Sequence, residues 1–137
     1  MKVNPKISEY MTTKPYVIGK DASISEAMNL MRKEIVRHLP IVDEDGALIG
    51  LITDRDVKLA SSLEGADRMK VEGVMVLLPY SVDHNAPLSE VVLEMAEKKY
   101  GCVLVIREGK LAGILTSDDG LRILGEMLEE AQRSVAA

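Results

Sequence analysis

The residues best suited to chemistry in this sequence are two threonine–aspartate pairs. Thr53 is followed three residues later by Asp56, and Thr116 is followed in the same way by Asp119. Each threonine ends an apolar, β-branched run, where a strand would pass directly into a helix. A hydroxyl and unpaired backbone N–H groups at such a point suit an anion such as phosphate. A carboxylate on the first helical turn can accept two hydrogen bonds from a vicinal diol, so the pairs predict a sugar-phosphate site.

The same pattern also has a purely structural interpretation. A threonine followed three residues later by an acidic residue resembles a capping box, in which each side chain accepts a hydrogen bond from the other residue's backbone N–H. For a single pair, capping is the stronger interpretation. The pair recurs in both halves after a glycine and two apolar residues, and this recurrence favours ligand binding.

These pairs lie in a repeat that occupies the whole chain. The repeat begins with a shift of 64 positions, and a one-residue deletion in a turn then changes the shift to 63. The matching segments are 11–16 with 75–80, 25–31 with 89–95, and 50–56 with 113–119. A repeat of this length is too long for a usual solenoid unit and too short for a full-sized domain. We therefore expect two half-domains, 1–65 and 66–137, packed about a pseudo-twofold axis, with a natural ligand site in the cleft between them.

Periodicity and turn residues predict a helix, two strands and a second helix in each half. The first half gives a helix over 24–35 capped by Ser23 or Asp21, and strands at 39–42 and 48–53 around a turn at 43–46. A second helix follows, capped by Thr53 or Asp54, and its apolar pattern consists of Val57, Leu59, Ala60 and Leu63. The second half gives a helix over 87–99, strands at 102–106 and 111–116, and a longer final helix. The apolar stripe of that final helix consists of Leu121, Leu124, Met127, Leu128, Ala131 and Val135. An extra stripe of this kind indicates a partner surface.

Composition limits the classes of function. The chain has 137 residues, 47% hydrophobic content and neither Phe nor Trp, so we expect an α/β fold with helices packed on sheets through aliphatic side chains. A net charge of −5 without a basic stripe argues against direct nucleic-acid binding. No apolar run approaches the roughly 20 residues of a membrane span, and the start has no signal region, so we expect a cytoplasmic protein. The single cysteine, Cys102, lies in an apolar run and is expected to be a buried, inert thiol.

Four motifs in order carry a family resemblance. They are the Met-Thr-x-x-Pro opening at 11–15, the helix at 24–31, the His-Leu-Pro-Ile-Val-Asp run at 38–43, and the Gly-Leu-Ile-Thr-Asp-Arg-Asp run at 50–56. As an ordered, repeated set, they resemble a tandem pair of CBS domains, the regulatory unit often called a Bateman module. The resemblance implies β-α-β-β-α half-domains that pack through their sheets and leave two clefts. It also implies regulatory binding of adenosine-containing ligands, such as AMP, ADP, ATP, NAD or S-adenosylmethionine, with no required cofactor.

The resemblance also implies roles for individual residues. Asp56 and Asp119 match the family's ribose-binding aspartate, and Thr53 and Thr116 match the hydroxyl residue beside the phosphate. The residues expected to flank the adenine are Thr13, Pro15, Val17, Pro79 and Val82, with Ile18, Ile41 and Val105 as further walls.

Basic residues distinguish the first half from the second. Arg37 and His38 stand where nucleotide-binding family members place phosphate-contacting residues, whereas the second half has Gly101 and Cys102 there. The two clefts are therefore expected to be unequal. A half-buried strand role is an equal alternative for His38. Arg55 is either another phosphate contact or an exposed cation at a helix start, which the helix dipole disfavours unless an anion compensates it.

The resulting hypothesis is a regulatory module without catalysis that senses an adenine nucleotide and signals to an unidentified partner protein. Arg37 and Arg55 favour AMP or ADP over an uncharged ligand such as adenosine. A homodimer is expected because exposed helix faces need cover and twofold pairing is the commonest solution. An enzyme is one rival, but the sequence shows no nucleophile with a nearby base, no Gly-rich phosphate loop and no metal cluster. The other rival is a ligand-free dimerisation scaffold in which the threonine–aspartate pairs are only caps.

Overall fold

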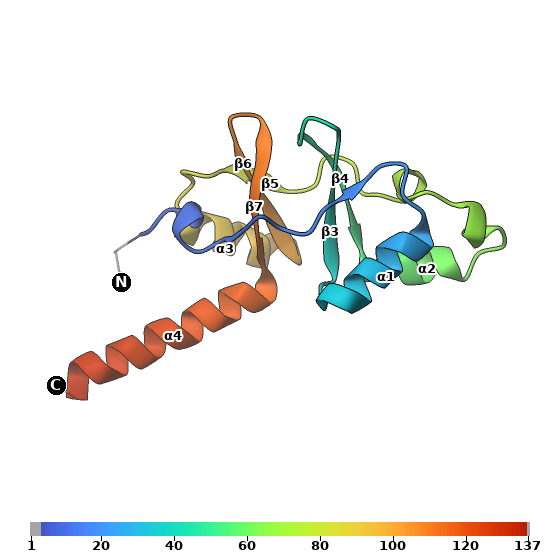
Figure 1. The fold of residues 1–137 in the computed structure, drawn as a ribbon. Coiled ribbons are helices and arrows are strands. Elements are labelled where there is room, and N and C mark those ends of the chain that lie inside the picture. Colours follow the sequence, from blue (N-terminus) through green and yellow to red (C-terminus); the bar gives the residue numbers. More distant parts are fainter. Residues whose placement is uncertain (1–3, 137) are drawn as a thin grey trace. The chain divides into compact units, whose positions relative to one another are not determined.

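The computed structural model describes residues 4–136 as a mixed α+β protein with two compact units (Figure 1). Of the described residues, unit 1 contains 4–13, 80–106 and 112–136, and unit 2 contains 14–79 and 107–111. Within the described residues there are four α-helices and two small sheets, which confirms the predicted α/β (α+β) class. None of those helices is both long enough and apolar enough to cross a membrane.

Unit 2 is built on a three-stranded sheet in the order β2-β3-β4. Its elements are β2 (Ile18–Gly19), α1 (Ile24–Glu34), β3 (His38–Val42), β4 (Leu48–Thr53), α2 (Asp54–Ser61) and the 3-10 helices η2 (Ala66–Arg68) and η3 (Val71–Gly73). β3 and β4 form the predicted antiparallel hairpin, and Gly46 in its turn has a φ of 84°, a value that favours glycine. Ala27 of α1 and Val57 of α2 are buried with Leu39 and Ile52 of the strands, so both helices pack on the sheet.

Local sequence explains where α1 begins and ends. Ser23 Oγ accepts the Glu26 N–H at 3.0 Å and Glu26 Oε2 accepts the Ser23 N–H at 3.3 Å, so the predicted cap at Ser23 is confirmed. The prediction that Ile35 continues the apolar face is wrong: it is 91% exposed and has a φ of 55°, a left-handed conformation that ends the helix. Leu59 and Leu63 are also exposed, at 63% and 56%, because α2 packs on the core through another face and ends before Leu63.

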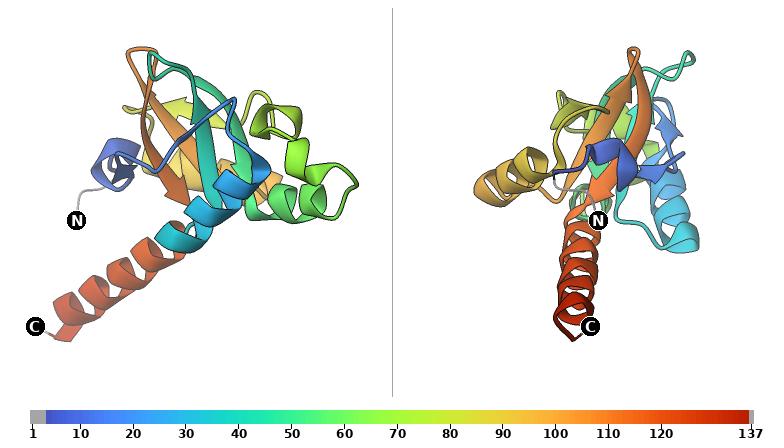
Figure 2. Two further views of the ribbon diagram at one scale, coloured as in Figure 1. Left: turned by 45° about the vertical axis from the view of Figure 1, so that its right-hand side comes forward. Right: turned by 90° about the vertical axis from the view of Figure 1, so that its left-hand side faces the viewer.

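Unit 1 holds a four-stranded sheet in the order β1-β7-β6-β5. Its elements are η1 (Ile7–Glu9), β1 (Thr12–Thr13), β5 (Ser81–Asp83), α3 (Leu88–Lys98), β6 (Cys102–Arg107), β7 (Lys110–Thr116) and α4 (Ser117–Ala136). Leu88, Val91 and Met95 of α3 and Ile123 of α4 belong to the core of this unit. Figures 1 and 2 show the C-terminal half of α4 projecting away from the sheet, and Ile123 is the one buried residue in the described length of the helix.

The segment that opens each repeat packs into the core formed by the other repeat. Ile7 is fully buried in unit 1 among residues of the second repeat, and its counterpart Val71 is fully buried in unit 2 among residues of the first. The backbone contacts correspond as well: the Ile7 N–H donates to the Ala86 carbonyl at 2.8 Å, and the Val71 N–H donates to the Ala22 carbonyl at 2.8 Å. We call these two segments, residues 5–13 and 69–76, the exchanged arms.

Each exchanged arm lies against the glycine of the repeated strand motif. A Cβ added at Gly50 in β4 would lie 2.6 Å from the Met75 sulfur and 3.0 Å from a carbonyl oxygen of the arm. A Cβ added at Gly113 in β7 would collide with the Met11 sulfur and lie 2.9 Å from the Thr12 carbonyl oxygen. The glycine therefore recurs in the sequence because the arm passes too close for a side chain.

Candidate functional site

The β3–β4 hairpin brings together the residues predicted to contact phosphate in the first half. Its register sets His38 directly opposite Thr53. The carbonyl of Arg37 accepts the N–H of Asp54 at 2.9 Å, which ties the start of β3 to the first residue of α2. Arg37 is exposed and His38 is half-buried. Two basic residues thus lie next to the threonine at which α2 begins.

The segment before β2 lies at the same end of the unit 2 sheet. Parallel pairing sets Ile18 opposite Ile41, so Pro15 and Val17, which precede β2, lie toward the end where β3 begins. Pro15 is half-buried and Val17 is 40% exposed, so both have surface open to a ligand. Ile41 does not, because it is fully buried in the core of unit 2. Arg55 is exposed on the first turn of α2.

Thr53 and Asp56 form a complete capping box at the start of α2. Oδ2 of Asp56 accepts hydrogen bonds from the Thr53 N–H at 2.9 Å and from Thr53 Oγ1 at 3.0 Å, while Thr53 Oγ1 accepts the Asp56 N–H at 3.2 Å. The second carboxylate oxygen, Oδ1, makes no hydrogen bond or ion pair with any residue in the described range 4–136. The pair therefore caps the helix, as its structural interpretation predicts, and one oxygen of Asp56 remains open to a donor.

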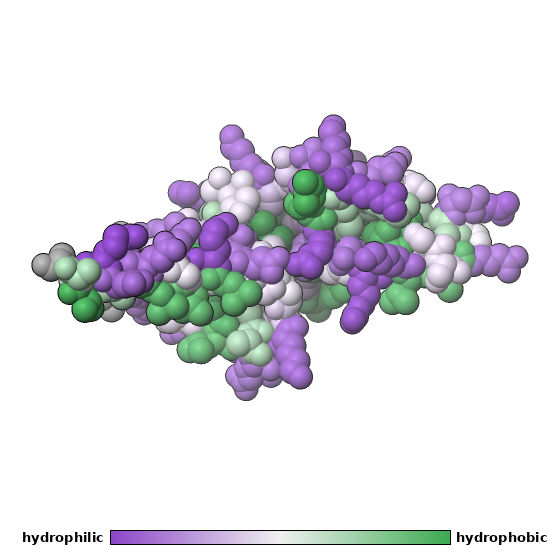
Figure 3. All heavy atoms as spheres, turned by 90° about the horizontal axis from the view of Figure 1, so that it is seen from below, coloured by the Kyte–Doolittle hydropathy of each residue, from purple (hydrophilic) through white to green (hydrophobic). Residues whose placement is uncertain are grey.

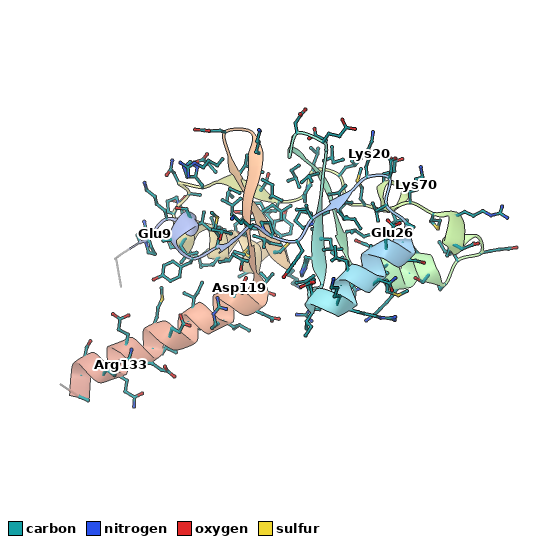
Figure 4. All side chains as sticks on the ribbon, in the orientation of Figure 1. Glu9, Lys20, Glu26, Lys70, Asp119 and Arg133 are labelled. Atoms are coloured by element: carbon teal, nitrogen blue, oxygen red, sulfur yellow. The ribbon has the colours of Figure 1, made fainter. Side chains whose placement is uncertain are left out.

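The second pair repeats this geometry in unit 1 with an added cation. Asp119 Oδ2 accepts the Thr116 N–H at 2.9 Å, and Thr116 Oγ1 accepts the Asp119 N–H at 3.2 Å. Oδ1 of Asp119 lies 3.6 Å from Nη1 of Arg122, one turn further along α4. The carbonyl of Gly101 accepts the Ser117 N–H at 2.9 Å, as the carbonyl before β3 does in unit 2. Figure 4 shows Asp119 on the first turn of α4, where the helix leaves the sheet.

An aromatic pair lies near the corresponding end of the unit 1 sheet, and sequence reasoning did not identify it. The Tyr80 carbonyl accepts the Leu104 N–H at 3.0 Å just before β5 begins, and the Tyr80 ring stacks on Tyr100 with centroids 5.0 Å apart. Partial burial raises the pKa of Tyr80 above its ordinary value. The corresponding residues in the first half are Tyr16 and Val36. Nothing in the separation of the two tyrosines along the chain indicates that they meet.

The residues predicted to flank the adenine lie on several different elements. Thr13 lies in β1 at one edge of the unit 1 sheet, whereas Val82 lies in β5 at the opposite edge. Thr13 is the last residue of its segment of unit 1, and Pro15 lies at the start of unit 2. Pro79 is half-buried in the chain outside the strands. Val105, suggested as a further wall, is fully buried in the core of unit 1 and is closed to a ligand.

The single thiol is unsuited to nucleophilic chemistry. Cys102 is 5% exposed, and burial raises the pKa of its thiol to about 12, so the reactive thiolate is scarce at neutral pH. The prediction of a buried thiol is confirmed. Across residues 4–136, no group of three or more His, Cys, Asp or Glu side chains is placed to hold a metal ion.

An apolar pocket of about 650 Å³ lies in unit 1 between α3, α4 and the first exchanged arm. Its apolar lining consists mainly of Pro5, Leu88, Val92, Met95, Tyr100, Leu115, Leu121, Ile123, Leu124 and Met127. Thr116 also lines the pocket, whereas Asp119 and Val82 do not, so the pocket borders the second threonine–aspartate pair. Leu121, Leu124 and Leu128 are each more than half exposed, and Figure 3 shows hydrophobic side chains gathered along one flank of the projecting helix.

Comparisons with known proteins identify the repeat. The family model described as the CBS domain matches residues 7–62 and 71–126. A structure from Vibrio cholerae, described as an acetoin utilization protein (AcuB), has 30% sequence identity and a TM-score of 0.87, and the match covers 96% of this chain and 98% of that chain. The AMP complex of CBSX2, a CBS-pair protein of Arabidopsis thaliana, has 25% identity and a TM-score of 0.79 over 90% of this chain and 98% of that one. The CBS domain pair of protein MJ0100, in complex with 5′-methylthioadenosine and S-adenosyl-L-methionine, has 29% identity and a TM-score of 0.79 over 91% and 99% of the two chains.

The two matched segments follow the repeat seen in the sequence. The first begins at Ile7 in one exchanged arm and ends just after α2, and the second begins at Val71 in the other arm and ends within α4. CBS pairs are regulatory ligand-binding modules. The chain belongs to the CBS domain family and contains two CBS domains, which form one CBS pair.

Proposed function

We propose that this chain is a regulatory module that binds an adenine nucleotide, AMP, ADP or ATP, and signals its presence to a partner protein. The observation that carries the proposal is the meeting of Thr53, Asp56 and His38 at one end of the unit 2 sheet, with Oδ1 of Asp56 open. Ribose hydroxyls would donate to that oxygen. The Thr53 hydroxyl would turn its hydrogen from Asp56 to a phosphate oxygen while still accepting the Asp56 N–H, so the cap would survive binding.

The charge of this region favours a ligand that carries phosphate. Three basic residues lie near Thr53: His38 pairs with it across the hairpin, Arg37 precedes His38, and Arg55 follows Thr53 by two residues. The N-terminus of α2 adds its partial positive charge. AMP, 5′-methylthioadenosine and S-adenosyl-L-methionine, which are bound in the similar structures, share an adenosine group. That shared group supports the adenosine class for this chain, and the basic residues support AMP, ADP or ATP over S-adenosylmethionine. NAD remains a member of the class to be tested.

A ligand panel tests the proposal directly. AMP, ADP, ATP, NAD and S-adenosylmethionine would be compared by thermal shift and titration calorimetry; a ligand at one hundred times its dissociation constant stabilises the fold by roughly 2.7 kcal/mol. We expect saturable binding of an adenylate that weakens at least tenfold in Asp56→Ala. Asp54→Ala is the matched control, because it removes a carboxylate from the same helical turn without breaking the box. Equal affinity in wild type and Asp56→Ala would refute the ribose assignment.

A structural scaffold is the second candidate, and the capping boxes favour it. In both pairs the threonine hydroxyl and one aspartate oxygen already have partners, so the motif has a use without any ligand. If none of the five compounds changes the melting temperature, the scaffold is the better account. Turnover of ATP in a sensitive phosphate-release assay would instead indicate an enzyme, which the proposal excludes.

The proposal includes a homodimer that buries the exposed face of α4. Leu121 and Leu124 line the apolar pocket, and Leu128 continues this exposed face along the helix. A second copy of the chain would supply an identical surface. Light scattering should show a dimer for the wild type and a monomer for Leu124→Arg, with Glu129→Gln as a control that keeps the dimer. A wild-type monomer at micromolar concentration would refute this part. The regulated partner is a cytoplasmic protein in this proposal, because adenine nucleotides report the metabolic state of that compartment.

A further inference from the structure

The two proposed ribose-binding aspartates differ in what surrounds their open oxygen. Oδ1 of Asp119 lies 3.6 Å from Nη1 of Arg122, and Nε of Arg122 lies 3.7 Å from Oε1 of Glu126. Arg122 therefore stands between two carboxylates on consecutive turns of α4. With the shift of 63 positions, the residue of the first repeat that corresponds to Arg122 is Leu59. Leu59 is uncharged and 63% exposed, so it offers Asp56 no equivalent cation.

The capping boxes make this difference relevant to a ligand. In both boxes Oδ2 of the aspartate accepts the threonine N–H at 2.9 Å, so Oδ1 is the oxygen left for a sugar hydroxyl. On Asp56, Oδ1 has no partner among the described residues. On Asp119, Oδ1 faces the guanidinium of Arg122. The Asp119 side chain is only 18% exposed, so its carboxylate has little room to turn away.

We propose that Arg122 is a positioning residue that makes the two sites unequal, so that the Asp56 site fills before the Asp119 site. The inference rests on the proposed function and adds an order of filling to it. A diol that approaches Asp119 must displace Arg122 from Oδ1 or share that oxygen with it, whereas a diol that approaches Asp56 meets a free acceptor. Because Arg122 is 58% exposed, the competition is modest: an exposed ion pair of this kind changes affinity by no more than about fivefold.

The reciprocal exchange of the two residues is the test. Arg122→Leu gives the second repeat the residue of the first, and Leu59→Arg gives the first repeat the residue of the second. Both positions are exposed, so the fold should tolerate the changes, and circular dichroism melts would verify this. AMP is the probe, titrated by calorimetry into the full chain at low and at high ionic strength. Asp56→Ala and Asp119→Ala identify which binding step belongs to which aspartate.

We expect two unequal steps in the wild type, with the weaker one lost in Asp119→Ala. Arg122→Leu should tighten that weaker step by up to about fivefold, and Leu59→Arg should weaken the tighter one by a similar factor. Both effects should shrink at high ionic strength, since salt screens an exposed ion pair, whereas an effect of packing alone would persist.

The possible failures are distinguishable. If AMP binds but neither exchange changes either step, or if Arg122→Leu weakens the second step, the inference about Arg122 is wrong and the proposed function stands. If the tighter step is lost in Asp119→Ala instead of Asp56→Ala, the order of filling is wrong. If neither AMP nor any other compound of the panel binds to the wild type, the proposed function and this inference fail together.

Discussion

Replacing Gly113 by alanine tests how tightly the first exchanged arm lies on β7. The added Cβ would overlap the Met11 sulfur and lie 2.9 Å from the Thr12 carbonyl oxygen, so the backbone of the arm must move as well as the methionine. Overpacking of this kind costs about 1–3 kcal/mol, and removing a glycine from a strand returns about 0.5–1 kcal/mol. We expect a net loss of about 1–2 kcal/mol in the free energy of unfolding, or roughly 5 °C in melting temperature for a chain of this size.

Two other glycines provide matched controls for this prediction. At Gly50 the nearest backbone atom would be 3.0 Å from the new Cβ and the closest atom belongs to a flexible methionine, so Gly50→Ala should cost less than Gly113→Ala. At Gly120 a new Cβ meets nothing within 4 Å, and Gly120→Ala in α4 should stabilise the protein by about 0.5–1 kcal/mol. Urea titrations followed by circular dichroism measure all three. A Gly113→Ala variant as stable as the wild type would refute the close approach of the arm.

Three further predictions concern buried and capping groups. Asp56→Ala removes two hydrogen bonds to Thr53 and should lower the free energy of unfolding by about 1–2 kcal/mol, at least twice the effect of Asp54→Ala; equal losses in urea titrations would contradict the box. The pKa of Cys102 is raised to about 12 in the folded protein, so its contribution to stability is complete below the unfolded value of about 8.5 and is lost as the pH rises toward 12. The unfolding free energy of the wild type should therefore fall more steeply above about pH 9 than that of Cys102→Ala, and parallel curves would show that the thiol is not buried. Val71→Ala removes a fully buried side chain and should cost about 2 kcal/mol in the same titration, whereas a cost typical of a surface position, below about 0.5 kcal/mol, would mean that the arm is loosely held.

The helices and hairpins were predictable because their signals are local. Ser23 and Glu26 have the spacing of a capping box, and an Asp-Gly turn separates two apolar runs, so α1 and the β3–β4 hairpin follow from short stretches of sequence. The end of α1 was harder to place, since Ile35 has the right spacing for the apolar face but a left-handed backbone that spacing does not reveal.

The exchanged arms were not predictable from local sequence. Ile7 and Val71 are similar in chemistry, and each lies in a segment without helical or strand periodicity. Neither segment has a residue pattern that indicates which of the two similar cores it joins. That choice depends on contacts between residues far apart in the chain, such as the bond from the Ile7 N–H to the Ala86 carbonyl.

The candidate site was predictable where its contacts are local in sequence. The spacing of Thr53 and Asp56 indicates their contact, and the hairpin predicts that His38 lies near Thr53. The spacing of Asp119 and Arg122 is also a known signal for an ion pair on a helix, and it was available in the sequence. The grouping of Thr13 with Val17 came from the family resemblance and not from a local residue pattern.

Because of the exchanged arms, neither repeat has a complete core when it is expressed alone. A fragment ending at residue 65 would keep most of the first core but lose Val71, and the remaining fragment would lose Ile7, although both side chains are fully buried in the intact protein. Each fragment could complete its core only with an arm from another molecule, which is domain swapping. Completing a core with an arm from another molecule would depend on protein concentration. A tandem duplication removes this dependence, because one chain then carries both arms and both cores.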